Sequence, residues 1–160
     1  MSIKNILVLT DFSENAQVAF EKAHDLARQL RARLYVLHVR DESNLRIAIK
    51  EGLLDAESTD EQLQAAVERL TEDRFSKLFA GVDRSQVEIG HLSRRGDSDA
   101  AAIAYAKEIN ADIIVIGRHG AGVMHSFLSS VLGSVAETVI KKSPCPVLVV
   151  RRDHGRKGEA

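Results

Sequence analysis

Short apolar runs recur along this chain and are separated by longer segments in which apolar residues follow helical spacing. The clearest runs are residues 6–9, 34–39, 112–116 and Val147–Val150. Runs of this kind are typical of strands that are buried on both faces, as they are in parallel sheets. A fifth run, residues 87–92, contains Glu88 and His91, and this polarity predicts a strand at the edge of the sheet.

The segments between these runs carry the start signals and apolar stripes of helices. Ser13 is of a residue type that caps helices, and an apolar stripe follows it over residues 16–30. A capping box at residues 59–62 opens a second long helix that ends near Gly81. A possible helical piece is expected at residues 45–54, and residues 96–99 open a further helix whose apolar stripe runs over residues 102–109. The last helix has an apolar stripe over residues 131–140 and opens at Gly133 and Ser134.

Strands that alternate with helices in this way need crossover connections, which are right-handed. The pattern therefore predicts an α/β fold, an open doubly wound five-stranded parallel sheet with helices on both faces. A chain of 160 residues, of which 44% are hydrophobic, is long enough to bury one core of ordinary size. We expect one domain over residues 1–152, followed by a flexible C-terminal tail over residues 153–160.

Charge and cysteine content narrow the setting in which the protein works. A net charge of -1 gives no general attraction to nucleic acid or to an anionic membrane, and the basic tail around Arg156 has no aromatic platforms for bases. No apolar run approaches the roughly 20 residues of a membrane span. Cys145 is the only cysteine, so no intrachain disulfide can form. We expect a cytoplasmic protein that binds neither nucleic acid nor membrane.

Polar residues and glycines follow several of the predicted strands, at the carboxyl ends where ligands of open α/β sheets collect. Thr10 and Asp11 follow the first strand, Val39 ends the second, and a glycine-rich loop follows residue 116. That loop runs from Gly117 to Gly133, at the opening of the last helix. Glycines let backbone amides approach an anion, and the first turn of a helix offers unpaired N–H groups. The loop is a candidate phosphate site, although sharp turns alone also place glycines after strands.

Several segments together make the sequence resemble the universal stress protein family over almost the whole chain, from Lys4 to Arg151. These segments are residues 6–13, 37–39, 112–120, 133–137 and 144–150, together with Gly96. Each falls in the chain order and structural context that the family has. The resemblance implies a strand order of 3-2-1-4-5 and homodimers paired through Val147–Val150. In one branch of the family it also implies an ATP site, whereas other branches lack bound nucleotide.

The ATP-binding branch is marked by G-x-x-G, nine further residues, and then G followed by Ser or Thr. Gly117 and Gly120 supply the first part and Gly133 with Ser134 the last, but here twelve residues separate the two parts. Three extra residues would add about 4.5 Å in a helix, enough to displace a phosphate donor. A loop can instead bulge outward and leave both ends in place, and the intact ends of the motif favour that alternative.

The resemblance also implies contacts for individual residues. Thr10 and Asp11 would contact the adenosine part of ATP, and the backbone of Val39 would meet the edge of the adenine. The residues implied around the ribose and phosphates, with or without Mg2+, are Gly117, His119, Gly120, Gly133, Ser134 and Val135. Leu9 stands where many members have proline, which alters the wall of the pocket but removes no donor.

Simpler structural interpretations stand beside these assignments. Asp11 could cap the following turn or helix without any ligand. His119 and His125 have no third residue at metal-ligand spacing, so no metal site is predicted. Ser134 and the serines before it are not enclosed by a G-x-S-x-G elbow, so no catalytic residue is predicted.

Three hypotheses about function remain. In the first, the protein is a stress-response regulator in which ATP shifts the conformations of residues 121–132 and so changes the surface offered to a regulatory protein partner. Hydrolysis of ATP would be slow and incidental, because no general base or magnesium carboxylate beyond Asp11 is evident. In the second, the chain is a dimeric protein-interaction module of the same fold that binds no nucleotide. A nucleotidyl transferase or hydrolase ranks last, because the chain lacks a G-x-x-x-x-G-K-[ST] loop.

Overall fold

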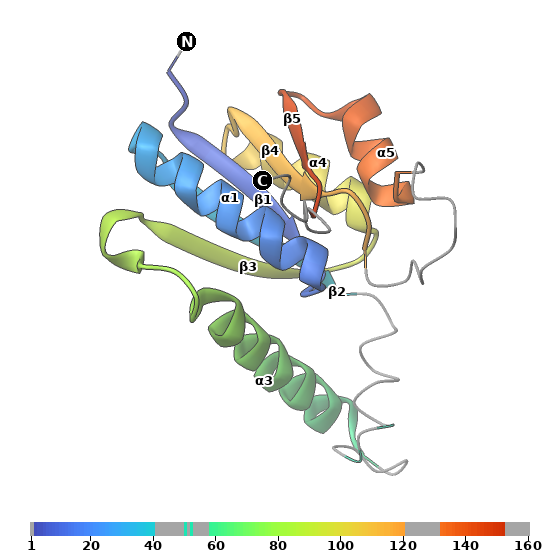
Figure 1. Cartoon of the computed structure of the whole chain (residues 1–160). Helices are drawn as coiled ribbons and strands as arrows, with labels where there is room; N and C mark the ends of the chain where they lie inside the picture. Colours follow the sequence, from blue (N-terminus) through green and yellow to red (C-terminus); the bar gives the residue numbers. More distant parts are fainter. Residues whose placement is uncertain (1, 41–49, 51, 53–57, 121–131, 153–160) are drawn as a thin grey trace, which may run out of the picture.

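The computed structural model describes residues 2–40, 50, 52, 58–120 and 132–152, and its centre is a five-stranded parallel sheet (Figure 1). The strands are β1 Asn5–Thr10, β2 Arg33–Arg40, β3 Ile89–Arg95, β4 Ile113–Gly117 and β5 Val147–Val150. Their order across the sheet is β3-β2-β1-β4-β5, and every neighbouring pair is parallel. The fold class and the strand order are therefore confirmed, and the polar strand β3 lies at an edge as predicted.

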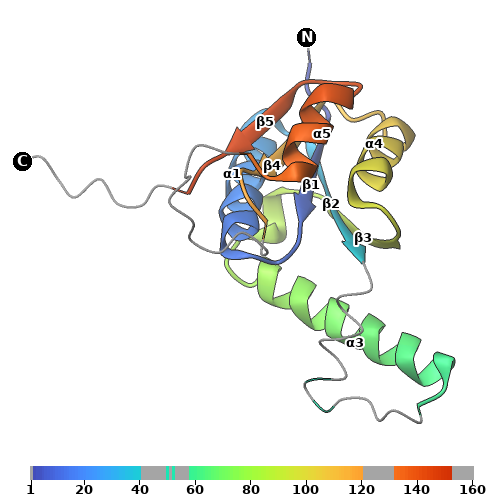
Figure 2. The ribbon, with the colours of Figure 1, turned by 90° about the vertical axis from the view of Figure 1, so that its right-hand side faces the viewer.

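Helices cover both faces of this sheet (Figure 2). They are α1 Glu14–Leu30, α3 Asp60–Phe79, α4 Ser98–Glu108 and α5 Ser134–Lys142, with a short 3-10 turn at Arg84–Gln86. The side chains of α1 and α3 pack on one face, and those of α4 and α5 pack on the other. The predicted caps are present: Ser13 Oγ accepts from the N–H of Ala16 at 3.2 Å, and Thr59 forms a capping box with Gln62.

Successive residues of β1 alternate between two apolar clusters, one on each face of the sheet. Ile6 and Val8 belong to the cluster under α1 and α3, whereas Leu7 belongs to the cluster under α4 and α5. None of these three side chains is exposed. Because the central strand is covered on both faces, it needs the uninterrupted apolar run that its sequence has.

Two predicted elements have wrong boundaries. The third strand is Ile89–Arg95 rather than residues 87–92: it begins later, because the turn Arg84–Gln86 and its cap occupy the chain just before it, and it also ends later. The last helix begins at Ser134, which agrees with the predicted opening at Gly133 and Ser134, but the apolar stripe predicted from residue 131 reaches back too far. Leu132 lies outside the helix, because Gly133 has an extended backbone with ψ at 150°. Both patterns start too early because apolar spacing continues through residues whose backbone is not regular.

Some sequence predictions concern parts of the chain that lie wholly or largely outside the described residues. They are the helical piece at residues 45–54, the outward bulge within residues 121–131, and the tail at residues 153–160. Among the described helices, none combines the length and the hydropathy that a membrane span requires.

Candidate functional site

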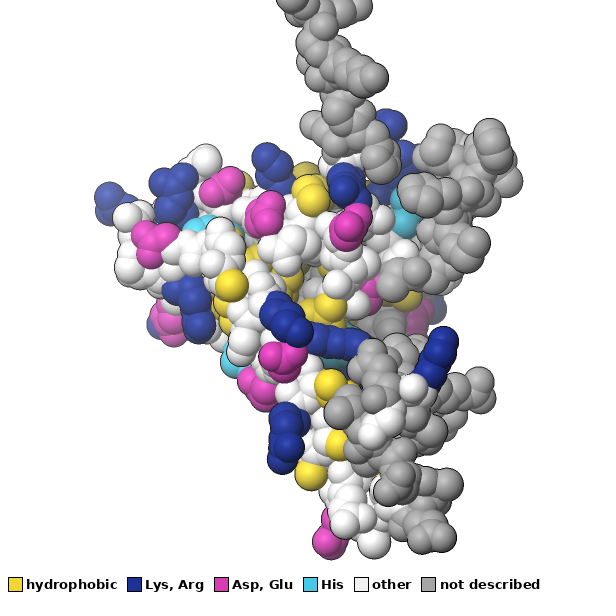
Figure 3. Space-filling model, turned by 60° about the horizontal axis from the view of Figure 1, so that its bottom comes forward, with side chains coloured by type: hydrophobic (Ala, Val, Ile, Leu, Met, Phe, Trp, Pro, Cys, Tyr) yellow, Lys and Arg dark blue, Asp and Glu magenta, His cyan; other side chains and the backbone are white. Residues whose placement is uncertain are grey.

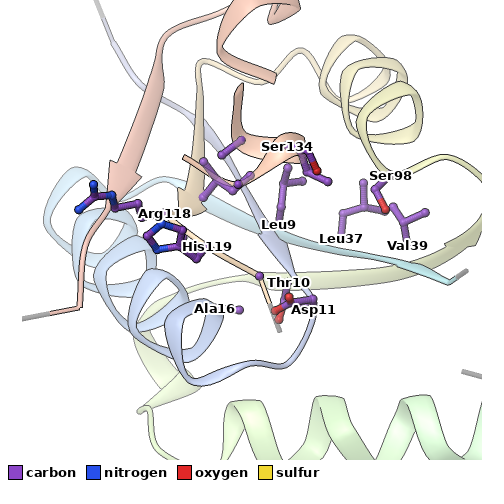
Figure 4. A pocket seen from close by; sticks show the side chains of 16 residues that line it. Leu9, Thr10, Asp11, Ala16, Leu37, Val39, Ser98, Arg118, His119 and Ser134 are labelled. Carbon is purple, nitrogen blue, oxygen red and sulfur yellow. The ribbon is translucent and has the colours of Figure 1, made fainter. Parts of the chain in front are cut away.

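A cavity of about 410 Å³ opens at the carboxyl ends of the central strands, beside the first turn of α5 (Figure 4). All the residues to which the sequence analysis gave a ligand contact line it: Thr10, Asp11, Val39, Gly117, His119, Gly120, Gly133, Ser134 and Val135. The fold thus brings together stretches from the start, the middle and the later part of the sequence. Their contacts with a nucleotide stay a prediction, but their shared location is a property of the structure.

The two glycine segments of the motif lie side by side, although twelve residues separate them in the sequence. The N–H of Gly133 donates to the carbonyl of Arg118 at 3.0 Å. A Cβ placed on Gly133 would lie 3.6 Å from the Cα of His119 and 3.8 Å from the N of Gly120. The expectation that the longer spacing leaves both ends of the motif in place is therefore confirmed.

The glycines of the first segment also have packing roles that require no ligand. A Cβ on Gly117 would lie 3.1 Å from the backbone oxygen of Asn15, in the first turn of α1. A Cβ on Gly120 would lie 2.7 Å from Asp11 Oδ2, closer than real contacts allow. Asn15 further ties α1 to this loop, since its Nδ2 donates to the carbonyl of His119 at 3.3 Å. Close approach of neighbouring chain segments is therefore one reason for glycine at both positions.

Asp11 stands in a tight turn between β1 and α1. Its Oδ1 accepts from the N–H of Ser13 at 3.0 Å, and Thr10 Oγ1 accepts from the N–H of Phe12 at 3.0 Å. The simpler interpretation of Asp11, as a residue that stabilises the turn, is therefore correct for one carboxylate oxygen. The other oxygen lies against Gly120, so the same side chain also forms part of the cavity wall.

The two ends of the cavity differ in chemistry, as Figure 4 shows. At one end lie the glycine segments, His119 and the N-terminus of α5, where backbone N–H groups and the helix dipole favour an anion. At the other end lie Leu37, Val39 and Ser98. The guanidinium of Arg118 is turned away from the centre of the cavity. The arrangement suits a ligand with an anionic group at one end and a largely apolar group at the other.

Several lining residues were not among the predicted site residues: Ala16, Leu37, Ser98, Ile116, Arg118 and Ala136. Leu37 could have been found, because alternate residues of a strand share a face and it lies two positions before Val39. Ser98 begins the helix that follows β3, and the rule about carboxyl ends of strands covers it too. Ala16 and Ala136 carry no sequence signal that separates them from other small residues on helices. Within the described ranges, no three His, Cys, Asp or Glu side chains are grouped so as to hold a metal ion.

Sequence comparisons relate the chain to known proteins over nearly its whole length. The family model described as the universal stress protein family matches residues 2–151. A protein of Staphylococcus aureus strain USA300 that bears the name universal stress protein is 31% identical over 153 residues, which cover 96% of this chain and 87% of that protein.

Solved structures share the fold. The universal stress protein UspA from Lactobacillus plantarum has a TM-score of 0.68 and 27% identity, and the match covers 94% of this chain and 99% of that one. A universal stress protein in complex with cAMP matches with a TM-score of 0.58 and 21% identity, over 94% of this chain and 98% of that one. The universal stress protein from Archaeoglobus fulgidus in complex with dAMP has a TM-score of 0.55 and 23% identity, with coverage of 93% and 98%. At such identities, the last two matches establish the fold alone.

Proposed function

The chain belongs to the universal stress protein family, and from that membership we propose that it is a stress-response regulator that binds ATP, with or without Mg2+, in the cavity at the carboxyl ends of the strands. The adenine would lie at the apolar end beside Val39, and the phosphates would lie at the glycine segments and Ser134. Binding would change the surface around the loop after β4 and so the affinity for a protein partner. The Asp11 carboxylate, which lines the cavity, would accept a hydrogen bond from a ribose hydroxyl or bind a hydrated cation.

The observation that carries this proposal is the 3.0 Å hydrogen bond from the N–H of Gly133 to the carbonyl of Arg118. It keeps the start of α5 against the loop after β4, so that one polyphosphate can reach both segments. The structures with cAMP and dAMP support an adenine nucleotide as the class of ligand. The triphosphate itself is supported by the G-x-x-G and G-S segments of the motif.

We propose no catalytic role beyond slow, incidental hydrolysis of ATP. Among the described lining residues, Asp11 is the only carboxylate, and one of its oxygens is already engaged by the N–H of Ser13. Rapid hydrolysis needs a group that orients the attacking water and ligands that hold the metal on the phosphates. Release of phosphate over many turnovers by the purified protein would instead support the transferase or hydrolase hypothesis.

A calorimetric titration of the purified protein with ATP, with and without Mg2+, tests the nucleotide site when Gly133→Asp is compared with the wild type. Gly133 has φ at -64° and caps α5, a position that Asp favours, so the variant is expected to fold. Its carboxylate would face the phosphates, and repulsion between like charges a few ångströms apart should weaken ATP binding by about a hundredfold or more.

Gly81→Asp, just after α3 and outside the cavity, is the matched control. Equal heats for the wild type and Gly133→Asp would refute the proposed phosphate site.

A second candidate function, a dimeric interaction module without nucleotide, is favoured by the far edge of the sheet. Among the strands that the structure describes, β5 pairs only with β4, and Leu148 near its centre is 40% exposed. Ile140 on α5 is 43% exposed. An unpaired edge strand with apolar side chains invites pairing with a second copy across a two-fold axis. We propose a homodimer through Val147–Val150, which is compatible with either candidate function. If the wild type bound no ATP, the dimeric interaction module would be the remaining candidate function.

A further inference from the structure

The turn that carries Asp11 has an unusual backbone conformation. Phe12 has φ at 61°, in the left-handed region that bulky side chains rarely adopt. Its N–H donates to Thr10 Oγ1, and the following N–H donates to Asp11 Oδ1, each at 3.0 Å. A conformation of this kind persists only where neighbouring groups hold it. The groups that do so decide where the Asp11 carboxylate lies.

His38, near the end of β2, contacts this turn in two ways from the face of the sheet opposite the cavity. Its Nδ1 donates to the carbonyl of Thr10 at 2.9 Å; a carbonyl can only accept, so the proton is on Nδ1. Its ring lies 4.4 Å from the ring of Phe12, centroid to centroid. Phe75 of α3 packs against both rings, at 5.0 Å from Phe12 and 6.4 Å from His38. Only 5% of His38 is exposed, so the imidazole is fixed in place.

We infer that His38 is a positioning residue of the nucleotide site, whose imidazole holds the backbone of Thr10 and the ring of Phe12 so that the Asp11 carboxylate stays in the cavity wall. His38 does not itself line the cavity and acts only through this turn. On its other side the carboxylate lies against Gly120, where an added Cβ would come within 2.7 Å of Asp11 Oδ2. The nucleotide part of this inference rests on the proposed function, whereas the control of the turn by His38 does not.

The groups around His38 favour its neutral form. Burial is the largest cause and lowers the pKa of His38 from its ordinary 6.5; the bond to Thr10 and the Asp11 carboxylate offset this in part, while Arg74 on α3 and Arg40 on β2 lower it further. The unfolded chain therefore binds this proton at a higher pH than the folded chain does. Stability from the neutral ring is complete above pH 6.5 and is lost as the pH falls below that value. A protonated ring would keep the Nδ1–H bond to Thr10 but would be a buried cation beside two arginines, and we expect this charge to disturb the packing of the ring against Phe12 and Phe75.

Titration of the full chain with ATP at pH 7.5 and pH 5.5 tests this inference with matched variants. His38→Leu removes the donor and should weaken ATP binding about tenfold at the higher pH. In His38→Asn the side-chain N–H takes the place of Nδ1–H without titrating, so affinity should return to within about threefold of the wild type. His24→Leu is the control, because His24 is also 5% exposed and bonds a carbonyl, that of Asp83 at 2.9 Å, but lies outside the cavity. This variant should keep the affinity of the wild type.

The dependence on pH separates positioning from general destabilisation. Between pH 7.5 and 5.5 the wild type should lose several-fold more affinity than His38→Asn, because titration of the ATP phosphates is common to both proteins and only the wild type carries the imidazole. Equal affinities for the wild type and His38→Leu, or identical pH profiles for the wild type and His38→Asn, would overturn the inference.

Hydrogen exchange in the nucleotide-free protein provides a readout that does not depend on ATP. The N–H groups of Phe12 and Ser13 should exchange faster in His38→Leu than in the wild type or in His24→Leu, while those of β4 keep their protection. If the wild type had no affinity for ATP, the proposed function would be wrong, and these exchange rates alone would decide the role of His38. Exchange rates of Phe12 and Ser13 that are the same in His38→Leu and in the wild type would refute the inference that His38 holds the turn.

Discussion

Gly117 and Gly120 border the same cavity, but a side chain at each position would meet a different kind of neighbour. At Gly117 the obstacle is the backbone oxygen of Asn15, 3.1 Å from an added Cβ, and the first turn of α1 would have to move. At Gly120 the obstacle is Asp11 Oδ2 at 2.7 Å, the tip of a side chain that can rotate away. The first glycine therefore matters mainly for packing, and the second for the shape of the ligand site.

Alanine at these two positions should separate stability from binding. Gly117→Ala is expected to lower the free energy of unfolding by about 1–3 kcal/mol, as overpacking against backbone does. Gly120→Ala should change that free energy by less than about 1 kcal/mol but displace the Asp11 carboxylate and weaken ATP binding. Urea denaturation and calorimetry on both variants measure the two effects. A Gly120→Ala protein that binds ATP like the wild type would show that the position of Asp11 is unimportant.

The residues of the cavity were predictable where a local pattern marked them and not where packing selected them. Gly133 and Ser134 have a recognisable motif, and Val39 ends a buried strand, so the sequence points to them. His38 has the same local pattern as a histidine that merely fills the core. Its contacts with Phe12, in the turn after β1, and with Phe75, on α3, depend on how these elements pack against β2, and no spacing rule shows this.

At the scale of helices and strands, existence and order were predictable, whereas ends were predictable only where a cap marks them. α1 and α3 begin at side-chain caps, Ser13 and Thr59, and both starts agree with the sequence. α5 begins at Ser134, after Gly133, which supplies no side-chain cap, and there the predicted apolar stripe extends back beyond the start of the helix. The start of β3 was misplaced for a similar reason, since Val87 is 5% exposed although it precedes the strand.

The cap of α1 should contribute measurably to stability. Ser13→Ala removes the acceptor for the N–H of Ala16 and should lower the free energy of unfolding by about 1 kcal/mol. Ser76→Ala, on the exposed face within α3, is the control and should be neutral or slightly stabilising, because alanine favours a helix interior. Chemical denaturation measures both, and equal losses in the two variants would argue against the cap.

At the scale of the whole molecule, the sheet has two different edges. The β3 edge carries polar residues, with His91 paired to Glu72 at 3.2 Å, whereas β5 presents Leu148. Leu148→Lys should convert the proposed dimer into a monomer, because two-fold pairing of β5 would bring the new cations close together. Leu30→Lys, at an equally exposed leucine on α1, should leave the dimer intact. Analytical ultracentrifugation measures the oligomeric state of both variants. If Leu148→Lys were still a dimer, the interface would not involve β5.

The strand order β3-β2-β1-β4-β5 has a consequence for the time at which the cavity can form. Thr10 and Asp11 leave the ribosome early, but the wall opposite them consists of Gly133 and Val135. A nascent chain that has been synthesised only as far as β4 already contains the central strand, yet it lacks one side of the cavity. A ligand that needs the complete cavity can therefore bind only after α5 has been synthesised and has docked on the sheet.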